Sequence, residues 1–282
     1  RGLGDVYKRQ VPGTHITASL LSYLLFNCYQ MCSPDYRESK NRLSDMEWNT
    51  CRQNLDNWTD KGAVQLNKLI PALKSMALEQ GANVNVDETW CRYQTHLGHR
   101  KTYMWCLVNR KAGIVIFFYA DCLDESSNNH ENNHNHNILK DFLGDAQIKS
   151  LQNDGYNIYM YLDNELMEVE YLCCLAHARN KFKDAYNQGC EKAHFFLEQI
   201  AKLYTREDDY RRFNLTASKI KEKRNDTYTN GIVNALRSEL YDLLALPEAG
   251  MSDLMRTALN YLHKFWNQLF AYRKDGEYTI DN

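Results

Sequence analysis

The stretch "NVNVDETW" (residues 83–90) sets the period of the central part of the chain. Val84 and Val86 alternate with asparagines, as the side chains of a half-buried strand do. The pattern then runs into Asp87 and Glu88, although strands disfavour aspartate. We therefore expect a strand that ends at Asp87. Its carboxylate is then either an ordinary turn residue or a ligand held at the end of a strand.

Two further strands are predicted directly after this one, in "KTYMWCLVNR" (101–110) and "AGIVIFFYADC" (112–122). The segment "NRKAG" (109–113) between them is a good hairpin connection. A polar loop, "DESSNNHENNHNHN" (124–137), and a helix, "NILKDFLG" (137–144), follow. The first part of this region is therefore expected to be a three-stranded meander.

The meander is followed by alternating strands and helices. "SLQNDGYNIYMYL" (150–162) predicts a short strand, a turn at Asp154-Gly155 and the start of a helix. "MEVEYLCC" (167–174) predicts a last strand before a helix. The order β-β-β-α-β-α-β indicates an α/β fold in which helices flank a mixed sheet.

Helical patterns precede and follow the sheet. In residues 14–80, Thr14 or Thr17 is a candidate N-cap, and Ser44 with Glu47 forms a candidate capping box. Trp48 and Trp58 in this region are expected in its core rather than on DNA. Residues 178–273 are expected to be helical throughout, with breaks near Gly189, Asn225 to Gly231, and Pro247.

Composition excludes several classes of protein. The chain has 282 residues, 44% of them hydrophobic, and a net charge of −2, so it can fill a core and its total charge indicates no partner. Its nine cysteines include no CxxC pair, which favours free thiols in a reducing cytoplasm over a zinc ribbon. No apolar run reaches the length of a membrane span, and no signal peptide is visible.

Asp87 and Asp154 could meet at neighbouring strand ends, although they lie 67 positions apart. Ligand sites in such sheets favour the carboxyl ends of strands. Converging carboxylates are what Mg²⁺ binds, together with waters and substrate phosphates. Spacing alone leaves the plainer alternative open, that one aspartate caps a strand and the other belongs to an Asp-Gly turn.

Four motifs in order add a resemblance. "VDET" (86–89), "LQNDGY" (151–156), "CLAHARNKF" (174–182) and "YRKDGEYTIDN" (272–282) resemble the transposases of bacterial insertion sequences in the group numbered sixty-six. That family reads DET, DGY, CxAHxRRxF and DGxxxIDNN, followed by ERxxR. The resemblance covers residues 14–282. The chain departs from it at Leu175 and Asn180, where the family has Trp and Arg.

The resemblance implies a ribonuclease-H-like catalytic core with an Asp-Asp-Glu triad that binds Mg²⁺ or Mn²⁺ and cleaves and transfers DNA. Asp87 and Asp154 match its two aspartates. The Glu belongs to the ERxxR that follows "IDN", so we expect it beyond Asn282 and expect this chain to be catalytically incomplete. The expected partners are the DNA of element ends and target, a second copy of the chain and accessory proteins of the element, in a bacterial cytoplasm.

The resemblance also predicts a domain organisation. We expect a non-native leader (1–10), a helical region (11–81), the catalytic core (82–178), a helical insertion (179–273) and the start of a C-terminal core segment cut short (274–282). Two alternatives remain open: a non-catalytic DNA-binding remnant of such an enzyme, and a ribonuclease-H-like nuclease unrelated to transposition.

Two groups of possible metal ligands have simpler interpretations. Cys174 and His177 form a CxxH pair without the further ligands of structural zinc, so packing and hydrogen bonding beside the active site is expected. His130, His134 and His136 lie in the Asn-rich loop, where a solvated segment is the simplest interpretation.

Basic residues concentrate in the first part of the expected insertion. Residues 178–224 hold twelve Lys or Arg against seven Asp or Glu, a net charge of +5. A solvated helix face explains much of this, and a DNA-binding surface is the second interpretation. The DNA-binding candidates are Arg179, Lys181, Lys183, Arg211 and Arg212. The first three are expected on the same side as the two aspartates.

Overall fold

The computed structural model describes residues 11–12, 14–45, 47–95, 98–119, 136–155, 169–246 and 251–282. The chain divides after Lys74 into two compact units. Several of the predictions concern residues outside the described parts: the leader (1–10), His130, His134, the side chain of His136, the helix expected from residue 156, and Pro247. In those parts, no helix combines the length and the apolar character that crossing a membrane requires.

The smaller unit is helical, as predicted. Its segments are α2 (Ala18–Leu25), η1 (Phe26–Gln30), α3 (Asp35–Arg37), η2 (Glu38–Arg42), α4 (Leu43–Asp45), α5 (Arg52–Leu66) and η3 (Asn67–Leu69), and α6 (Ile70–Ala77) spans the division. The Thr17 side chain caps α2 by accepting a hydrogen bond from the Leu20 N–H. Trp48 and Trp58 stack with ring centroids 5.7 Å apart and pack against the buried core of the unit.

The capping box predicted at Ser44 and Glu47 is wrong. Ser44 lies inside α4, and the next helix begins only at Arg52. Glu47 has a φ of 59°, a left-handed conformation in which a helix cannot continue. The sequence has the Ser-x-x-Glu pattern of a capping box, but the left-handed conformation of Glu47 prevents a helix from running through it.

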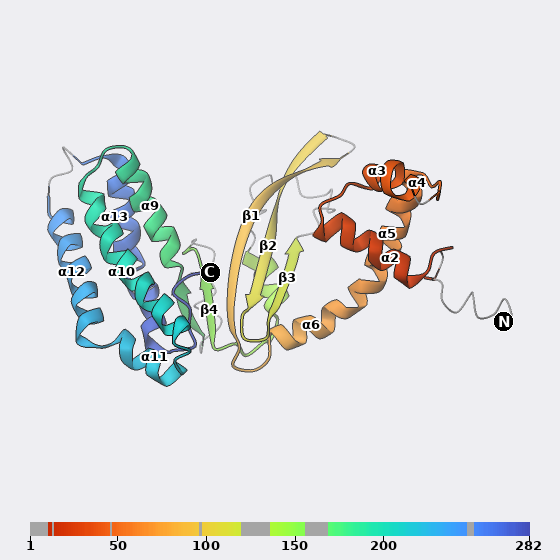
Figure 1. Ribbon diagram of the computed structural model, residues 1–282. Helices are drawn as coiled ribbons and strands as arrows, with labels where there is room; N and C mark the ends of the chain where they lie inside the picture. The colour runs from red at the N-terminus through yellow and green to blue at the C-terminus, as the bar shows by residue number, and fades with distance from the viewer. Residues whose placement is uncertain are drawn as a thin grey trace. The chain divides into compact units, whose positions relative to one another are not determined.

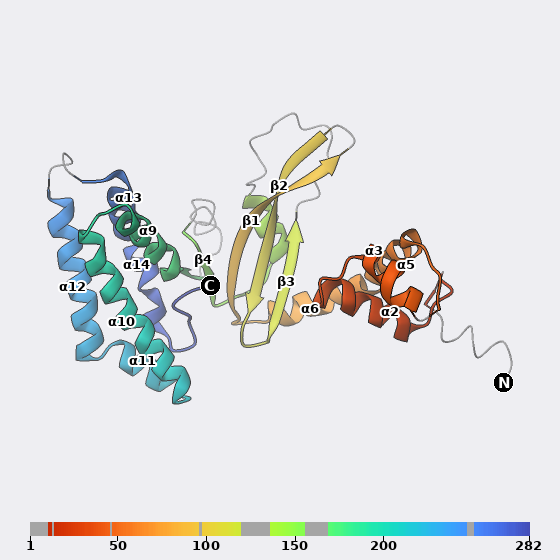
Figure 2. The same ribbon diagram turned by 45° about the horizontal axis from the view of Figure 1, so that its top comes forward.

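The larger unit contains one mixed sheet of five strands, seen in Figures 1 and 2. The strands are β1 (Asn83–Thr95), β2 (Gly98–Asn109), β3 (Ile114–Tyr119), β4 (Ser150–Asn153) and β5 (Glu170–Cys173). Their order is β3-β2-β1-β4-β5; β2 runs antiparallel to β1 and β3, whereas β4 runs parallel to β1 and β5. The predicted meander and the α/β class are confirmed.

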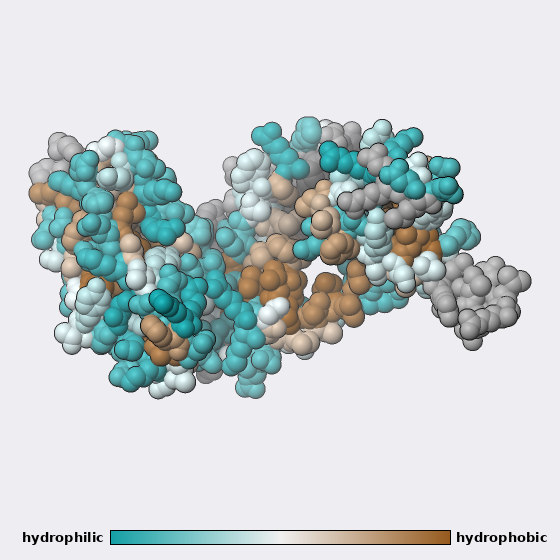
Figure 3. All heavy atoms as spheres, in the orientation of Figure 1, coloured by the Kyte–Doolittle hydropathy of each residue, from teal (hydrophilic) through white to brown (hydrophobic). Residues whose placement is uncertain are grey.

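The two faces of the sheet differ in polarity, because side chains alternate along each strand. One face buries Val84, Val86, Trp105 and Leu107 under α7 (His136–Leu143), where Phe142 stacks on Phe118 at 3.9 Å. The other face carries Asn85 and Asp87 on β1. It also presents Val115 and Phe117 of β3, which are 52% and 65% exposed. Figure 3 shows hydrophobic side chains gathered over β2 and β3.

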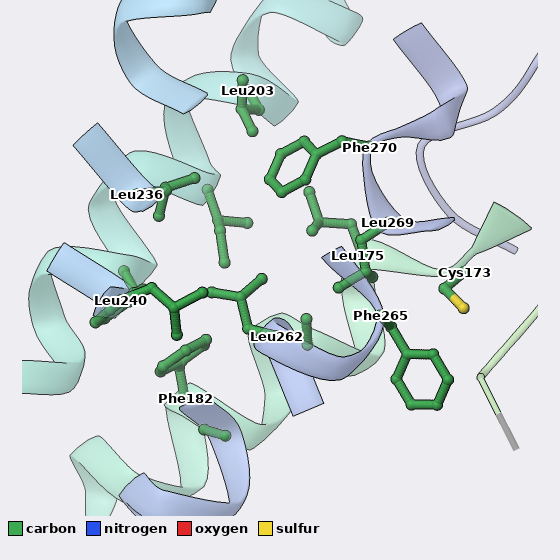
Figure 4. Close-up of a cluster of buried hydrophobic side chains, with 14 of the residues drawn as sticks. Cys173, Leu175, Phe182, Leu203, Leu236, Leu240, Leu262, Phe265, Leu269 and Phe270 are labelled. Atoms are coloured by element: carbon green, nitrogen blue, oxygen red, sulfur yellow. The ribbon is translucent and has the colours of Figure 1, made fainter. Parts of the chain in front are cut away.

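Helices after the sheet form one bundle on an apolar core. They are α9 (Leu175–Asn187), α10 (Lys192–Arg212), α11 (Ala217–Arg224), α12 (Thr227–Leu244), α13 (Asp253–Lys264), α14 (Trp266–Leu269) and η5 (Ala271–Lys274). Phe182 and Phe196 stack at 4.3 Å in its centre. Figure 4 shows this core and, at its border, Phe265, whose ring points away from the other side chains.

The predicted helix breaks are only partly correct. The chain turns at Gly189, with a φ of 89°, and again between Arg224 and Thr227. Gly231, however, lies inside α12. A further break at Asn214, with a φ of 47°, separates α10 from α11 and had no glycine or proline to signal it.

Candidate active site

The two aspartates follow the paired part of β1 and β4. Asn83 pairs with Ser150 and Asn85 with Gln152 in parallel, so Asp87 and Asp154 each come two residues after the last paired position of their strands. Burial raises the pKa of the Asp87 carboxyl above its usual value, the neighbouring His177 opposes this, and the charge of Asp154 adds to it. The two carboxylates are therefore close enough to repel each other.

Asp87 does not end its strand, which corrects the prediction. β1 continues to Thr95, because β2 supplies an antiparallel partner to every residue from Asn85 onward. The parallel pairing with β4 does end before Asp87. Asp87 pairs with Cys106 and Glu88 with the core residue Trp105, so the two neighbouring carboxylates project to opposite faces, as expected.

The Asp154-Gly155 turn is fixed by both glycine geometry and packing. Gly155 has a φ of 80°, and its N–H donates to the Asn153 side chain at 2.6 Å. A Cβ on Gly155 would lie 3.1 Å from the Tyr261 hydroxyl, 3.2 Å from Phe265 and 3.3 Å from the Cys173 sulfur. A side chain at position 155 would thus be strained and crowded.

Tyr261 of α13 holds this turn from the helix bundle. Its hydroxyl donates a hydrogen bond to the backbone carbonyl of Asp154. Burial, above all, raises the pKa of Tyr261, so the hydroxyl stays protonated and remains a donor. Tyr261 lies 107 positions from Asp154 and in no recognised motif, which is why sequence analysis missed it.

Cys174 and His177 meet beside the two carboxylates. Cys174 follows β5, caps α9 and donates its N–H to the Asn153 carbonyl at 2.7 Å. A hydrogen bond that the His177 ring donates to the Cys174 sulfur is the largest cause that raises the pKa of His177; burial opposes the rise, and the charges of Cys174, Asp154 and Asp87 add to it. The Nδ1 atom of His177 is buried without a hydrogen-bond partner, and a packing and hydrogen-bonding role for the pair stays a prediction.

A pocket of about 240 Å³ opens beside Asp154. Its lining comes from the turn, from α9 and from α13: Asp154, Gly155, His177, Lys181, Tyr261, Lys264 and Phe265. Helix α13 thus contributes to the same pocket as the strand-end aspartate.

The predicted basic residues separate into two groups. Lys181 lies one helical turn after His177 and lines the pocket, as expected. Arg179 and Lys183 do not share this face, because positions two residues from His177 or Lys181 are rotated by about 200°. The Arg179 guanidinium lies over the Tyr204 ring at 5.2 Å.

Arg211 and Arg212 lie at the far end of α10. Arg211 pairs with Asp208 at 2.7 Å, and Arg212 lies over the Phe213 ring at 5.8 Å. Both arginines are exposed. They remain candidates for DNA contact away from the pocket.

The motif "DGEYTIDN" (275–282) forms a strap across the polar face of the sheet. Gln152 donates to the Thr279 carbonyl at 2.9 Å, and Asn85 donates to the Thr279 hydroxyl at 3.0 Å. The Asn282 side chain donates to the carbonyl of Val86 at 3.4 Å. The strap therefore runs to the residue that precedes Asp87.

The strap is tied to the bundle through buried Arg224, another residue that sequence analysis missed. Arg224 pairs with Glu207 at 2.6 Å and donates to the carbonyls of Tyr272, Asp275 and Tyr278. Its guanidinium thus joins α10 and α11 to the strap. No sequence pattern distinguishes an arginine of a buried ion pair, so Arg224 could not be told from the other basic residues of this region.

The donor set fits part of a hard-cation site. Asp87 and Asp154 offer carboxylate oxygens, and a cation between them would offset the repulsion that contributes to the raised pKa of Asp87. Across the described parts of the chain, no group of three or more His, Cys, Asp or Glu is placed to hold a metal. The pair would therefore need water and phosphate oxygens as further ligands.

Comparison with known proteins gives a family. No curated protein matches the chain. A family model described as "Transposase IS66 family" matches residues 13–282, which is nearly the whole sequence and includes all four motifs. The chain belongs to the IS66 family of transposases.

Proposed function

We propose that Asp87 and Asp154 are the catalytic carboxylates of a metal-dependent site that cleaves and joins DNA at the ends of an insertion sequence. Membership of a transposase family gives the general activity. The observation that supports the residue assignment is the parallel pairing of β1 with β4, after which Asp87 and Asp154 follow at the same spacing, together with the effect of the Asp154 charge on the pKa of Asp87. The mixed five-stranded sheet agrees with a ribonuclease-H-like core.

The two carboxylates would hold Mg²⁺ or Mn²⁺, which supplies a Lewis acid and an activated oxygen nucleophile for phosphoryl transfer. The protein's own contribution is position. Asp87 is fixed within a paired strand, and Asp154 is fixed by the Gly155 turn and the Tyr261 hydrogen bond. Positioning of this kind supplies much of the rate in phosphoryl transfer.

The third acidic residue of the family is proposed to act next to the strap. The resemblance assigns it to a segment after "IDN", and the contact of Asn282 with the Val86 carbonyl brings that motif beside Asp87. Residues 82–178 are proposed as the core and 179–273 as its insertion. A second copy and accessory proteins remain predictions.

Metal binding tests the assignment directly. Electron paramagnetic resonance can follow the titration of the chain with Mn²⁺. Asp87→Asn and Asp154→Asn should each weaken Mn²⁺ binding by about tenfold or more, since each removes a ligand. Exposed Asp145→Asn is the matched control and should bind as the unmodified chain does. Unchanged Mn²⁺ affinity in both site variants would refute the assignment.

A cleavage assay separates the alternatives. DNA carrying the element ends, incubated with Mg²⁺, should be cut by the chain and more slowly or not at all by the two Asn variants. Cleavage without preference for the element ends would indicate a general nuclease. DNA binding without cleavage would indicate a non-catalytic remnant.

A further inference from the structure

We propose that Lys181 and Lys264 form a binding subsite for a phosphate of the DNA backbone next to the bond that reacts at Asp154. The inference rests on the proposed function and adds a residue from each of two helices to that site. Lys181 comes from α9, whereas Lys264 is the last residue of α13, in the segment proposed as the insertion. The proposed insertion would thereby contribute a residue that binds the DNA substrate directly.

The pocket brings these cations beside Asp154. Asp154, His177, Lys181 and Lys264 line the same hollow of about 240 Å³. Lys181 is partly exposed and Lys264 is exposed, so both ammonium groups can meet a ligand from solvent.

Aromatic rings position both ammonium groups. The Lys181 nitrogen lies 4.9 Å from the centre of the Tyr261 ring, and the Lys264 nitrogen lies 4.9 Å from that of Phe265. Phe265 is buried beneath the pocket. Rings that carry cations on their faces limit the freedom of long side chains and lower the entropy lost when a ligand binds.

The charge of the pocket favours a phosphodiester over a neutral ligand. Its lining has two lysines against one carboxylate. A compact ammonium is an effective point charge for phosphate oxygens. A DNA strand whose reacting phosphate lies at Asp87 and Asp154 has its neighbouring phosphate within one nucleotide, where the two lysines can bind it.

The competing explanation is that the lysines only shield the charge of Asp154. The two explanations predict different effects on DNA binding when the positive charge is removed. Shielding lysines lower the affinity for a metal cation, so their removal would strengthen Mn²⁺ binding and leave DNA binding unchanged. Phosphate-binding lysines contribute to DNA binding even when no metal is present.

The test measures DNA binding in EDTA, where cleavage cannot occur. A fluorescein-labelled duplex of arbitrary sequence is titrated with the full chain over a series of salt concentrations, with anisotropy as the readout. The double variant Lys181→Gln/Lys264→Gln should bind about tenfold more weakly at low salt. The slope of log K against log salt should fall by about 1.8, because two phosphate contacts are lost.

Matched variants complete the design. Lys181→Arg/Lys264→Arg keeps both charges and should retain binding and slope. Lys61→Gln/Lys68→Gln removes two exposed charges from the smaller unit and should leave the slope unchanged. The loss should be equal for element-end and unrelated duplexes, since phosphate contacts carry no sequence information.

Two results would overturn the subsite: an unchanged slope in the Gln variant, or a loss confined to element-end DNA. Neither result touches the proposed function, which depends on Mn²⁺ binding at Asp87 and Asp154. Conversely, Asn variants that bind Mn²⁺ normally would refute the catalytic assignment while a lowered salt slope still supported the phosphate contacts.

Discussion

The helix bundle and the strap, two regions of the larger unit, are held by opposite kinds of contact. The bundle buries an almost purely apolar core around Phe182 (Figure 4). The strap (275–282) has two buried apolar side chains, Tyr278 and Ile280, and is otherwise fixed by hydrogen bonds and ion pairs.

The difference shows how position and stability are supplied separately. Apolar burial is non-directional, so the bundle gains stability without fixing any one atom to a fraction of an ångström. Hydrogen bonds are directional, and the strap uses them at Asn85, Gln152 and Arg224 to set one register against the sheet. Near Asp87, directional hydrogen bonds therefore fix the positions of the residues more closely than apolar burial would.

Breaking the polar link should have the largest effect on stability. Arg224→Met leaves Glu207 buried without its partner, and it leaves the carbonyl of Tyr272 in η5 and two strap carbonyls, of Asp275 and Tyr278, without this donor. We expect a loss of about 3–5 kcal/mol in the free energy of unfolding. Urea unfolding measures it, with Phe182→Ala as an apolar comparison of similar size, also about 3–5 kcal/mol.

A rescue experiment distinguishes the two losses. Arg224→Met/Glu207→Leu removes both charges and should recover much of the stability. The strap carbonyls remain without their donor, so amide exchange at residues 275–282 should stay fast. No recovery in the double variant would show that the pair itself is not the source of the loss.

The turn where the bundle meets the acidic pair should show a smaller effect. Gly155→Ala imposes a left-handed φ on alanine and crowds Tyr261 and Phe265, at about 2 kcal/mol in total. Gly144→Ala is the matched control, because Gly144 also has a positive φ of 56° but has nothing within 4 Å of the added Cβ.

The difference between these two alanine variants isolates the packing against α13. Gly155→Ala should also weaken Mn²⁺ binding, because Asp154 precedes the displaced residue. Equal unfolding energies and equal Mn²⁺ affinities in the two variants would show that α13 does not position the turn.

The sequence could predict the features that depend on local signals, but not those that depend on contacts between distant segments. Local periodicity predicted the meander, the hairpin at 109–113 and the two later strands, because strand alternation and turn residues are local signals. The sequence could not show that β1 runs past Asp87, since its antiparallel partner determines that. It could not show Tyr261 or Arg224 in their roles, since each acts on a segment about 50 or more positions away.

The smallest expected effect concerns the ion pair that fixes the start of the strap. Lys149 lies 2.8 Å from Asp275. Burial alone would raise the pKa of Asp275, but the Glu277 N–H and Lys149 outweigh it and hold the pKa below its usual 3.8. A carboxyl with a lowered folded-state pKa stabilises the protein above its unfolded-state pKa and loses this contribution as the pH falls through the folded-state pKa.

Asp275→Asn keeps an acceptor for the Glu277 N–H but removes the charge. It should therefore be less stable than the unmodified chain at neutral pH, by less than about 1 kcal/mol because both partners are partly exposed. The gap should close as the pH drops below 3.8 and should narrow with added salt. Lys149→Met should show the same pH dependence, and the double variant should lose no more than the larger single loss. Exposed Asp145→Asn is the control. A gap that stays constant down to the lowest pH would show that the strap is held here by its neutral hydrogen bonds, with no measurable share from the charge.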